Sequence, residues 1–166
     1  VGRLEHQKAF HFAIEAFSKI VIEFPSIRLK IVGQGFFESD LKKMVKELSI
    51  ENSVDFEGFQ KNMISYYINA KLVLLTSLYE GFPNVLIESI SLGTPVVAFD
   101  CPSGPKEIVI EGKNGYLAEY LSINDLSKKI YLALNTQWNY KVVYESSFRY
   151  KMTTIIQQWE SLIDEV

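Results

Sequence analysis

The sequence predicts an α/β fold in which helices flank one open parallel sheet. Short apolar runs typical of strands alternate along the chain with longer helical patterns. Two of these runs, 72–76 and 96–99, are apolar almost throughout, which is typical of strands covered on both faces. Single helices separate most successive strands, and this order implies βαβ units with right-handed crossovers. We therefore expect a Rossmann-like domain whose ligands bind beyond the carboxyl ends of the strands.

The first half of the chain contains four predicted strands and three predicted helices. Residues 1–4 have the pattern of a strand end, and a helix follows over about 8–24, where Pro25 stops it. Apolar residues alternate with Arg and Lys in 27–32, which predicts a strand. The next elements are a helix over 40–48, a strand over 54–56 ending at Gly58, a helix over 63–70 and a strand over 72–76.

The second half continues the alternation and then becomes helical. Its predicted elements are a helix over 84–92, a strand over 96–99, a short helix over 105–110, a turn at Asn114-Gly115 and a strand over 116–119. Two or three helices from about residue 122 are expected to close the domain. The last one carries apolar residues at helical spacing, which predicts one apolar stripe. This stripe consists of Met152, Ile155, Ile156, Trp159, Leu162, Ile163 and Val166.

Length and composition exclude several classes of protein. The 166 residues suffice for one domain, and a content of 48% hydrophobic and 22% charged residues excludes disordered and fibrous chains. The formal net charge of −3 gives no electrostatic reason to expect a nucleic-acid partner. The sequence has one cysteine, Cys101, so we expect no internal disulfide and a reducing compartment.

The chain shows no targeting signal. No apolar run approaches the roughly 20 residues that span a bilayer, and no signal-peptide pattern opens the sequence, so we expect a cytoplasmic protein. The sequence begins at Val1, on a segment with the pattern of a strand end. We therefore expect it to be part of a longer chain.

Glycines, charges and prolines gather directly after the predicted strands. They are Gly2-Arg3, Gly33-Gln34-Gly35, Gly58-Phe59, residues 77–84, residues 100–107 and Glu119. Loops are often polar and glycine-rich for purely conformational reasons. The residue types in these loops nevertheless suit a phosphorylated ligand at the carboxyl edge of the sheet.

Two cations near the start of the chain suit a diphosphate. Lys8 lies near the predicted start of a helix, where its charge opposes the positive end of the helix dipole. A bound anion would make the position of Lys8 favourable. The Arg3 guanidinium, the Lys8 ammonium and free helix N–H groups would hold this anion without a metal. The alternative is that Arg3 and Lys8 are two solvated surface cations.

The segment from Glu80 to Glu88 is the most specific motif. Pro83 suits the start of a helix, and Gly81 leaves the backbone open to close approach. Glu88 lies on an otherwise apolar helix, where a carboxylate needs a hydrogen-bonding partner. Its two oxygens match a vicinal diol such as that of a ribose, and Glu80 would reach another part of the same ligand. The alternative is that both glutamates are merely exposed.

Several motifs together resemble a known family. They are Val1-Gly2-Arg3-Leu4 with Lys8, Gly33-x-Gly35, Glu80 to Glu88 with Gly81-Phe82-Pro83, Gly93-Thr94-Pro95-Val96-Val97, and Gly104 through Glu107 to Asn114-Gly115. In this order they resemble the C-terminal, donor-binding domain of retaining glycosyltransferases of family four, one half of a GT-B architecture. The resemblance covers about residues 1–119, and the C-terminal helices fit it less specifically.

The resemblance implies transfer of a sugar from a nucleotide-sugar to an acceptor hydroxyl with retention of configuration. By matching position, it implies catalytic roles for Arg3, Lys8 and Glu80, with the two cations stabilising the departing diphosphate. Glu88 would bind the ribose, and the turn at Gly58-Phe59 would pack near the base. The implied donor-binding residues are Gly2, Gly33, Gly35, Gly58, Phe59, Gly81, Phe82, Pro83, Asn84, Val85 and Glu88.

The resemblance also implies the reaction partners. Residues 100–107 resemble members that build bacterial surface polysaccharides and glycoconjugates from UDP-linked sugars. A glycan or lipid-linked acceptor would bind an N-terminal domain that this sequence lacks, so we expect the 166 residues alone to be inactive. The full-length protein is expected at the inner face of the cytoplasmic membrane. One departure is Ala9, where the family usually has glycine and where a methyl group is expected to narrow the approach to the phosphates.

No cofactor or metal ion is expected. The Asp-x-Asp motif that holds a divalent cation in the other large glycosyltransferase fold is absent, and the nearest match is Asp55-x-Glu57. His6, His11 and Cys101 are too widely spread in the sequence to suggest a metal site.

Two other functions remain open at the level of sequence. Gly33-x-Gly35 after a strand, with Asp55 about twenty residues later, imitates the dinucleotide fingerprint of an oxidoreductase. Its third glycine would fall at Glu38, whose charge would repel a pyrophosphate. The other alternative is a non-catalytic module that binds a nucleotide-sugar.

Overall fold

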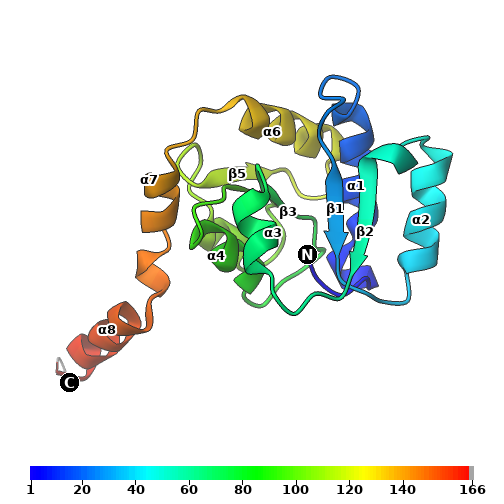
Figure 1. Ribbon diagram of the computed structural model, residues 1–166. Coiled ribbons are helices and arrows are strands. Elements are labelled where there is room, and N and C mark those ends of the chain that lie inside the picture. Colours follow the sequence, from blue (N-terminus) through cyan, green and yellow to red (C-terminus); the bar gives the residue numbers. More distant parts are fainter. Residues whose placement is uncertain (165–166) are drawn as a thin grey trace.

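The computed structural model describes residues 1–164, with the side chains of 158, 161, 162 and 164 excluded. It confirms an α/β fold with parallel strands flanked by helices (Figure 1). The strands form two parallel ladders instead of the one sheet that we expected. One ladder joins β1 (Leu29–Val32) to β2 (Val54–Gly58), and the other has the order β3 (Val73–Leu75), β4 (Val96–Phe99), β5 (Gly115–Ala118).

The helices follow the strands in the predicted alternation. They are α1 (Phe10–Ile20), α2 (Glu38–Glu47), α3 (Ile64–Asn69), α4 (Asn84–Ile90), α5 (Pro105–Ile108), α6 (Ile123–Asn135), α7 (Tyr140–Glu145) and α8 (Met152–Asp164). Single 3-10 turns cover His6–Lys8, Glu51–Ser53 and Phe148–Tyr150. The N-terminus of α6 is capped by Ser122, whose hydroxyl accepts a hydrogen bond from the N–H of Asp125.

The predicted helix over 8–24 is wrong at both ends. It begins only at Phe10, because Ala9 adopts a left-handed conformation with φ 44° and ψ 47°. It ends at Ile20, and a turn follows in which the N–H of Phe24 bonds to the carbonyl of Ile20. Pro25 disfavours helical geometry at the residue before it, which is consistent with this early end.

Residues 1–4 are not a strand, although they run beside one. The N–H of Gly2 donates to the carbonyl of Val32 at 2.9 Å, and the N–H of Leu4 donates to the carbonyl of Gln34 at 3.0 Å. The segment therefore continues past the end of β1 in the same direction. It leads the chain from the strand ends into the turn that carries Lys8.

The core lies on both faces of β4, as its apolar run predicts. Val96 and Ala98 pack in a cluster with Leu86 and Ile90 of α4. The alternate residues Val97 and Phe99 pack in a second cluster with residues of α1 and α6, among them Ala16 and Leu126. A third cluster joins α1, β1 and α2. The alternation places helices on both faces of the strands, as in a doubly wound fold.

The C-terminal helices divide in their packing. The side chain of Val143 in α7 is fully buried in the core, and α6 lies against α1 (Figure 1). The helix α8 extends away from the strands, and Met152, Ile156 and Trp159 are exposed on it. The predicted stripe is therefore uncovered in this structure. The side chain of Leu162, and Val166 altogether, lie outside the described residues.

Candidate functional site

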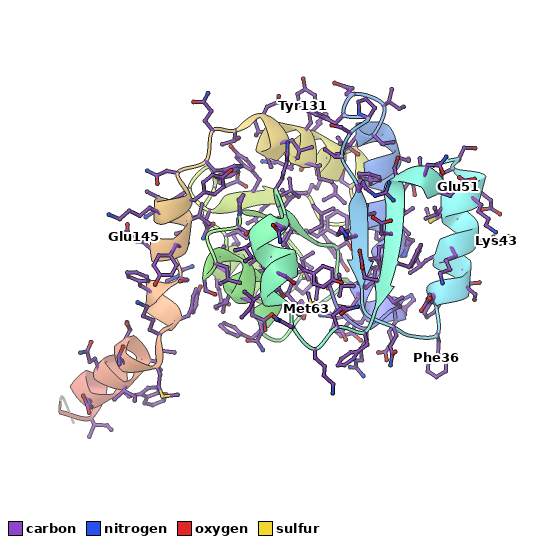
Figure 2. All side chains as sticks on the ribbon, in the orientation of Figure 1. Phe36, Lys43, Glu51, Met63, Tyr131 and Glu145 are labelled. Atoms are coloured by element: carbon purple, nitrogen blue, oxygen red, sulfur yellow. The ribbon has the colours of Figure 1, made fainter. Side chains whose placement is uncertain are left out.

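The loops after the five strands lie at the carboxyl edge, and hydrogen bonds join them in two groups. In the first group, the Gly33 N–H donates to the Gly58 carbonyl. In the second group, the Leu78 N–H donates to the Gln7 carbonyl, the Tyr120 hydroxyl to the Leu78 carbonyl and the Glu80 N–H to the Pro102 carbonyl. Aromatic side chains surround this edge. Phe36 is 93% exposed and points away from the body of the protein (Figure 2). The structure thus gathers the predicted ligand loops on one side of the molecule.

Lys8 and Glu80 are in direct contact at this edge. The Lys8 Nζ donates to the Glu80 Oε1 at 2.6 Å, and the Ser77 hydroxyl donates to the same oxygen at 2.5 Å. Only 7% of the Glu80 side chain is exposed, against 20% for Lys8. Two predicted site residues that are 72 positions apart are therefore held together, and a substantially buried carboxylate is stabilised by a cation and a hydroxyl.

The backbone at Ala9 fixes the position of Lys8. The Thr76 hydroxyl lies 3.2 Å from the carbonyl oxygens of both Lys8 and Ala9, which ties this turn to the end of β3. Ala9 is buried in the left-handed region, which glycine adopts more readily than alanine. This conformation accounts for a preference for glycine at the position. Lys8 lies two residues before the first residue of α1, near the start of a helix as the sequence predicts.

Glu88 is oriented by a tyrosine that the sequence did not reveal. The buried Tyr67 hydroxyl donates to the Glu88 Oε2 at 2.7 Å, while the Glu88 side chain itself lies at the surface. Burial and the Glu88 carboxylate both raise the pKa of Tyr67 well above its usual range, so the phenol remains a donor. Tyr67 is held in turn by the Thr94 hydroxyl, which donates to its carbonyl at 2.7 Å.

Arg3 is the most solvent-exposed of the predicted site cations. Its side chain is 76% exposed and lies 3.4 Å from the Glu5 carboxylate. Lys8 runs past the neighbouring Gly2, where an added Cβ would lie 3.4 Å from the Lys8 Cε. The Lys8 side chain therefore runs past the residue next to Arg3 in the chain, and the Arg3 guanidinium is available to an anion from solvent.

The glycines after β1 have a packing role that the sequence analysis missed. A Cβ on Gly33 would lie 1.8 Å from the Gly2 carbonyl oxygen, and one on Gly35 would lie 2.4 Å from that of Leu4. Gly33 also has a φ of +140°. These glycines allow residues 33–35 to pass against residues 2–4. Their predicted contact with a donor stays a prediction.

Gly81 follows β3 and Gly104 follows β4, and the two glycines differ in the space around them. Gly81 has open space where a Cβ would be, whereas a Cβ on Gly104 would lie 2.4 Å from the Pro83 Cδ. Pro83 immediately precedes α4, which begins with Asn84 and Val85. Phe59 is 64% exposed and Phe82 is 49% exposed. The Phe82 ring meets the Tyr150 ring edge-on, with 5.9 Å between the ring centroids. Gly58 has a φ of +64°.

Comparison with known proteins agrees with this arrangement. The family model described as Glycosyl transferases group 1 matches residues 1–149. The chain belongs to this family. It is 33% identical to an uncharacterised glycosyltransferase of Haemophilus influenzae, over 98% of this chain and 47% of that protein.

Solved glycosyltransferases share the fold. The lipopolysaccharide outer core galactosyltransferase WaaB matches with a TM-score of 0.87 and 25% identity. The Anabaena protein HepE, solved in complex with UDP, matches with a TM-score of 0.85 and 27% identity. Each match covers 99% of this chain and 47% of the other. This group 1 glycosyl transferase chain therefore spans about half the length of these three proteins.

The oxidoreductase alternative is not supported by the geometry. Asp55 lies inside β2, where its carboxylate accepts hydrogen bonds from Nε and Nη2 of Arg28 at 2.7 and 2.5 Å. Arg28 lowers the pKa of this carboxyl below its usual value. Asp55 is thus engaged away from the carboxyl edge, where a dinucleotide ribose would need it.

Residues 1–164 contain no group of three or more His, Cys, Asp or Glu side chains placed to hold a metal ion. Independence from metals stays a prediction for this glycosyl transferase chain. Within the same residues, no helix is long and apolar enough to cross a membrane.

We expect Gly35→Ala to destabilise the protein markedly, because its Cβ would overlap the Leu4 carbonyl. Gly81→Ala is the matched control, since open space surrounds that position. Urea unfolding should show a loss of about 1–3 kcal/mol or more for Gly35→Ala and a change within about 0.5 kcal/mol for Gly81→Ala. Equal stability of the two variants would contradict the packing role of Gly35.

Cys101 should react slowly with alkylating reagents. The thiol is buried at the carboxyl edge, and burial together with the nearby Glu80 carboxylate raises its pKa to about 11. Because the thiolate is the nucleophile, alkylation at pH 8 should be about 100-fold slower than in the urea-unfolded chain. The folded rate should still rise steeply between pH 8 and 10. A folded rate that levels off near pH 9 would show an ordinary thiol.

Proposed function

We propose that this chain is the donor-binding half of a retaining glycosyltransferase that takes sugar from a nucleotide-sugar, most simply a UDP-sugar. The observation that carries the proposal is the contact between Lys8 and Glu80 at the carboxyl edge, in a chain that belongs to the group 1 family. The acceptor is a glycan or lipid-linked glycan in bacterial surface polysaccharide or glycoconjugate assembly. The complex of HepE with UDP and the lipopolysaccharide assignment of WaaB support these choices.

The diphosphate would bind between the two cations. Lys8 is held by Glu80, so its ammonium is positioned before the donor arrives and retains two further N–H groups for phosphate oxygens. Arg3 is exposed and offers a planar fork to the same group. Negative charge develops on the diphosphate as the sugar bond breaks, and fixed cations stabilise that charge most in the transition state.

The nucleoside would extend toward Glu88. Tyr67 occupies one Glu88 oxygen, and the other oxygen has no hydrogen bond within residues 1–164. An oriented carboxylate with a vacant acceptor suits a ribose diol. The exposed ring of Phe59 offers an apolar face for the base. The sugar itself would lie near Glu80 and the backbone of Gly81, Phe82 and Pro83.

The reaction that we propose needs only protein cations and no metal. It also needs an acceptor domain, which the rest of a longer chain would supply. This chain covers 47% of the Haemophilus influenzae relative and 47% of WaaB. We expect the 166 residues alone to be inactive, and the full-length protein to act in the cytoplasm at the inner membrane face. A non-catalytic nucleotide-sugar module is the second candidate, and the observation that favours it is that this chain covers only 47% of WaaB and of HepE.

Glu88→Gln should weaken UDP binding by the full-length protein. The change removes a charged acceptor, which corresponds to about 1.5–3 kcal/mol, or about 10- to 150-fold in Kd. Tyr67→Phe should give a smaller loss, because it removes only the orienting bond. Glu47→Gln on α2 is the control, since Glu47 is exposed and pairs with Lys43 at the surface. Calorimetry that shows unchanged affinity for Glu88→Gln would contradict the ribose role.

Lys8→Ala should lower kcat more than it raises KM in the full-length enzyme, if Lys8 acts on the departing diphosphate. The variant also leaves Glu80 substantially buried without its cation, which is costly in itself. Glu80→Gln alone is therefore compared with the double variant Lys8→Ala, Glu80→Gln, which lacks that cost and should have a lower kcat than Glu80→Gln. Lys43→Ala serves as the control. A change confined to KM in both Lys8 variants would make Lys8 a ground-state anchor only.

A further inference from the structure

The motif Gly93-Thr94-Pro95-Val96-Val97 carries part of the family resemblance but has no role in the proposed donor site. Its last two residues belong to β4, and Gly93 makes the turn after α4 with a φ of +82°. Thr94 differs from these residues, because it is a polar residue of which only 4% is exposed. A buried hydroxyl needs a hydrogen-bonding partner, so the partners of Thr94 show which parts of the fold it joins.

Thr94 is bonded to the end of α4 through Ser89. The Thr94 N–H donates to the Ser89 carbonyl at 3.0 Å, and the Ser89 hydroxyl donates to the Thr94 carbonyl at 2.9 Å. Ser89 is fully buried and directly follows Glu88 in the chain. The two reciprocal bonds therefore fix Thr94 relative to the helical turn that carries the Glu88 carboxylate.

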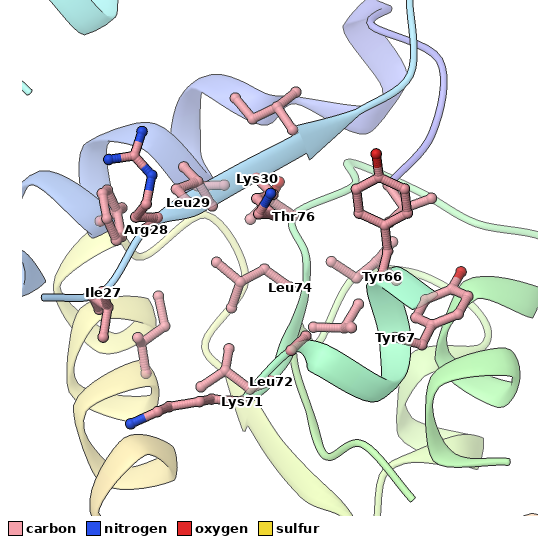
Figure 3. Close-up of a pocket in the computed structure, with 18 of the residues that line it drawn as sticks. Ile27, Arg28, Leu29, Lys30, Tyr66, Tyr67, Lys71, Leu72, Leu74 and Thr76 are labelled. Atoms are coloured by element: carbon pink, nitrogen blue, oxygen red, sulfur yellow. The ribbon is translucent and has the colours of Figure 1, made fainter. Parts of the chain in front are cut away.

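Thr94 is also bonded to α3, because its hydroxyl donates to the Tyr67 carbonyl at 2.7 Å. Figure 3 shows the adjacent side chains of Tyr66 and Tyr67 on α3, beside a cleft of about 610 Å³ that runs between β1 and β3. The Tyr66 hydroxyl donates to Glu57 on β2, and the Tyr67 hydroxyl donates to Glu88 on α4. The position of the Tyr67 side chain therefore depends on how α3 is attached, and Thr94 provides one of its attachments.

These hydrogen bonds close a ring that begins and ends at Glu88. The ring passes along the chain to Ser89, by hydrogen bonds to Thr94 and then to Tyr67, and through the Tyr67 hydroxyl back to the Glu88 Oε2. The Ser89, Thr94 and Tyr67 residues are at most 4% exposed, whereas Glu88 lies at the surface. A hydrogen bond is stronger in the interior of a protein than in water. The buried part of the ring is therefore a firm support for an exposed carboxylate.

We propose that Thr94 is a positioning residue for the nucleoside, because it holds Tyr67, and Tyr67 holds Glu88 in the orientation that accepts the ribose hydroxyls. This inference rests on the proposed function, in which Glu88 binds the ribose. Tyr67 occupies one oxygen of Glu88 and leaves the other to the ligand. A carboxylate that is already oriented loses less conformational entropy when the ligand binds. Thr94 is itself buried and acts only through Tyr67.

The preference for UDP over 2′-deoxy-UDP tests the proposal, because the deoxynucleotide lacks one of the hydroxyls that Glu88 would bind. Thr94→Val in the full-length protein removes the Thr94 hydroxyl and keeps the shape of the side chain. It should reduce the ratio of the two Kd values, measured by calorimetry, at least about threefold, as expected for one buried hydrogen bond. Thr94→Ser keeps the hydroxyl and should keep the ratio within about twofold of the unaltered protein.

Thr136→Val is the matched control. The Thr136 hydroxyl, at the end of α6, also bonds to a tyrosine, because it lies 3.0 Å from the Tyr116 hydroxyl. Its removal should leave the preference for UDP unchanged, since neither residue belongs to the ring that ends at Glu88.

The double variant Thr94→Val, Tyr67→Phe tests whether Thr94 acts through Tyr67. Its Kd ratio should equal that of Tyr67→Phe alone, because both changes release the same oxygen of Glu88. Ser89→Ala breaks the ring at another bond and should lower the ratio in the same way. It replaces Thr94→Val if that variant does not fold.

A lower melting temperature of Thr94→Val with an unchanged Kd ratio would make Thr94 a structural residue only and overturn the inference. A ratio that fell further in the double variant than in Tyr67→Phe would also overturn it, because Thr94 would then act by another route. Equal Kd values for the two nucleotides in the unaltered protein would instead contradict the ribose role of Glu88, and this inference with it.

Discussion

The contact between Lys8 and Glu80 ties the start of the chain to the loop after β3 across the divide between the two ladders. Glu80 is substantially buried and needs both Lys8 and Ser77 as partners. Lys8 can reach it only because Ala9 turns the backbone into the left-handed region and Thr76 binds the adjacent carbonyls. The position of the Lys8 cation therefore depends both on its ion pair with Glu80 and on the unfavourable left-handed conformation of Ala9.

The same edge shows how close backbone packing and ligand access are combined. Residues 33–35 approach residues 2–4 so closely that only glycine fits at positions 33 and 35. Gly81, the residue after Glu80, faces open space. The glycines of this edge thus have two roles. Gly33 and Gly35 allow two backbone segments to pack closely, whereas Gly81 leaves the surface open.

Local patterns predicted most of the secondary structure and less of the site. The apolar runs at β3 and β4 identified buried strands, because a strand that is covered on both faces has apolar residues at successive positions. The start of α1 escaped prediction, since the conformation of Ala9 depends on contacts with Thr76 far along the chain. The division of the strands into two ladders was not predicted either. Lys8, Glu80 and Glu88 were singled out by motif, and their roles stay predictions. Nothing near Tyr67 in the sequence connects it with Glu88.

The two tryptophans occupy very different surroundings, and this makes them separate optical reporters. Trp138 packs against Tyr116, and its indole N–H donates to the Ala133 carbonyl, so its emission follows the integrity of the fold. Trp159 on α8 is 64% exposed. A surface that came to cover α8 would shift the fluorescence of Trp159 to shorter wavelength and leave that of Trp138 nearly unchanged. The chain thus carries an intrinsic probe for whatever part of the protein meets its last helix.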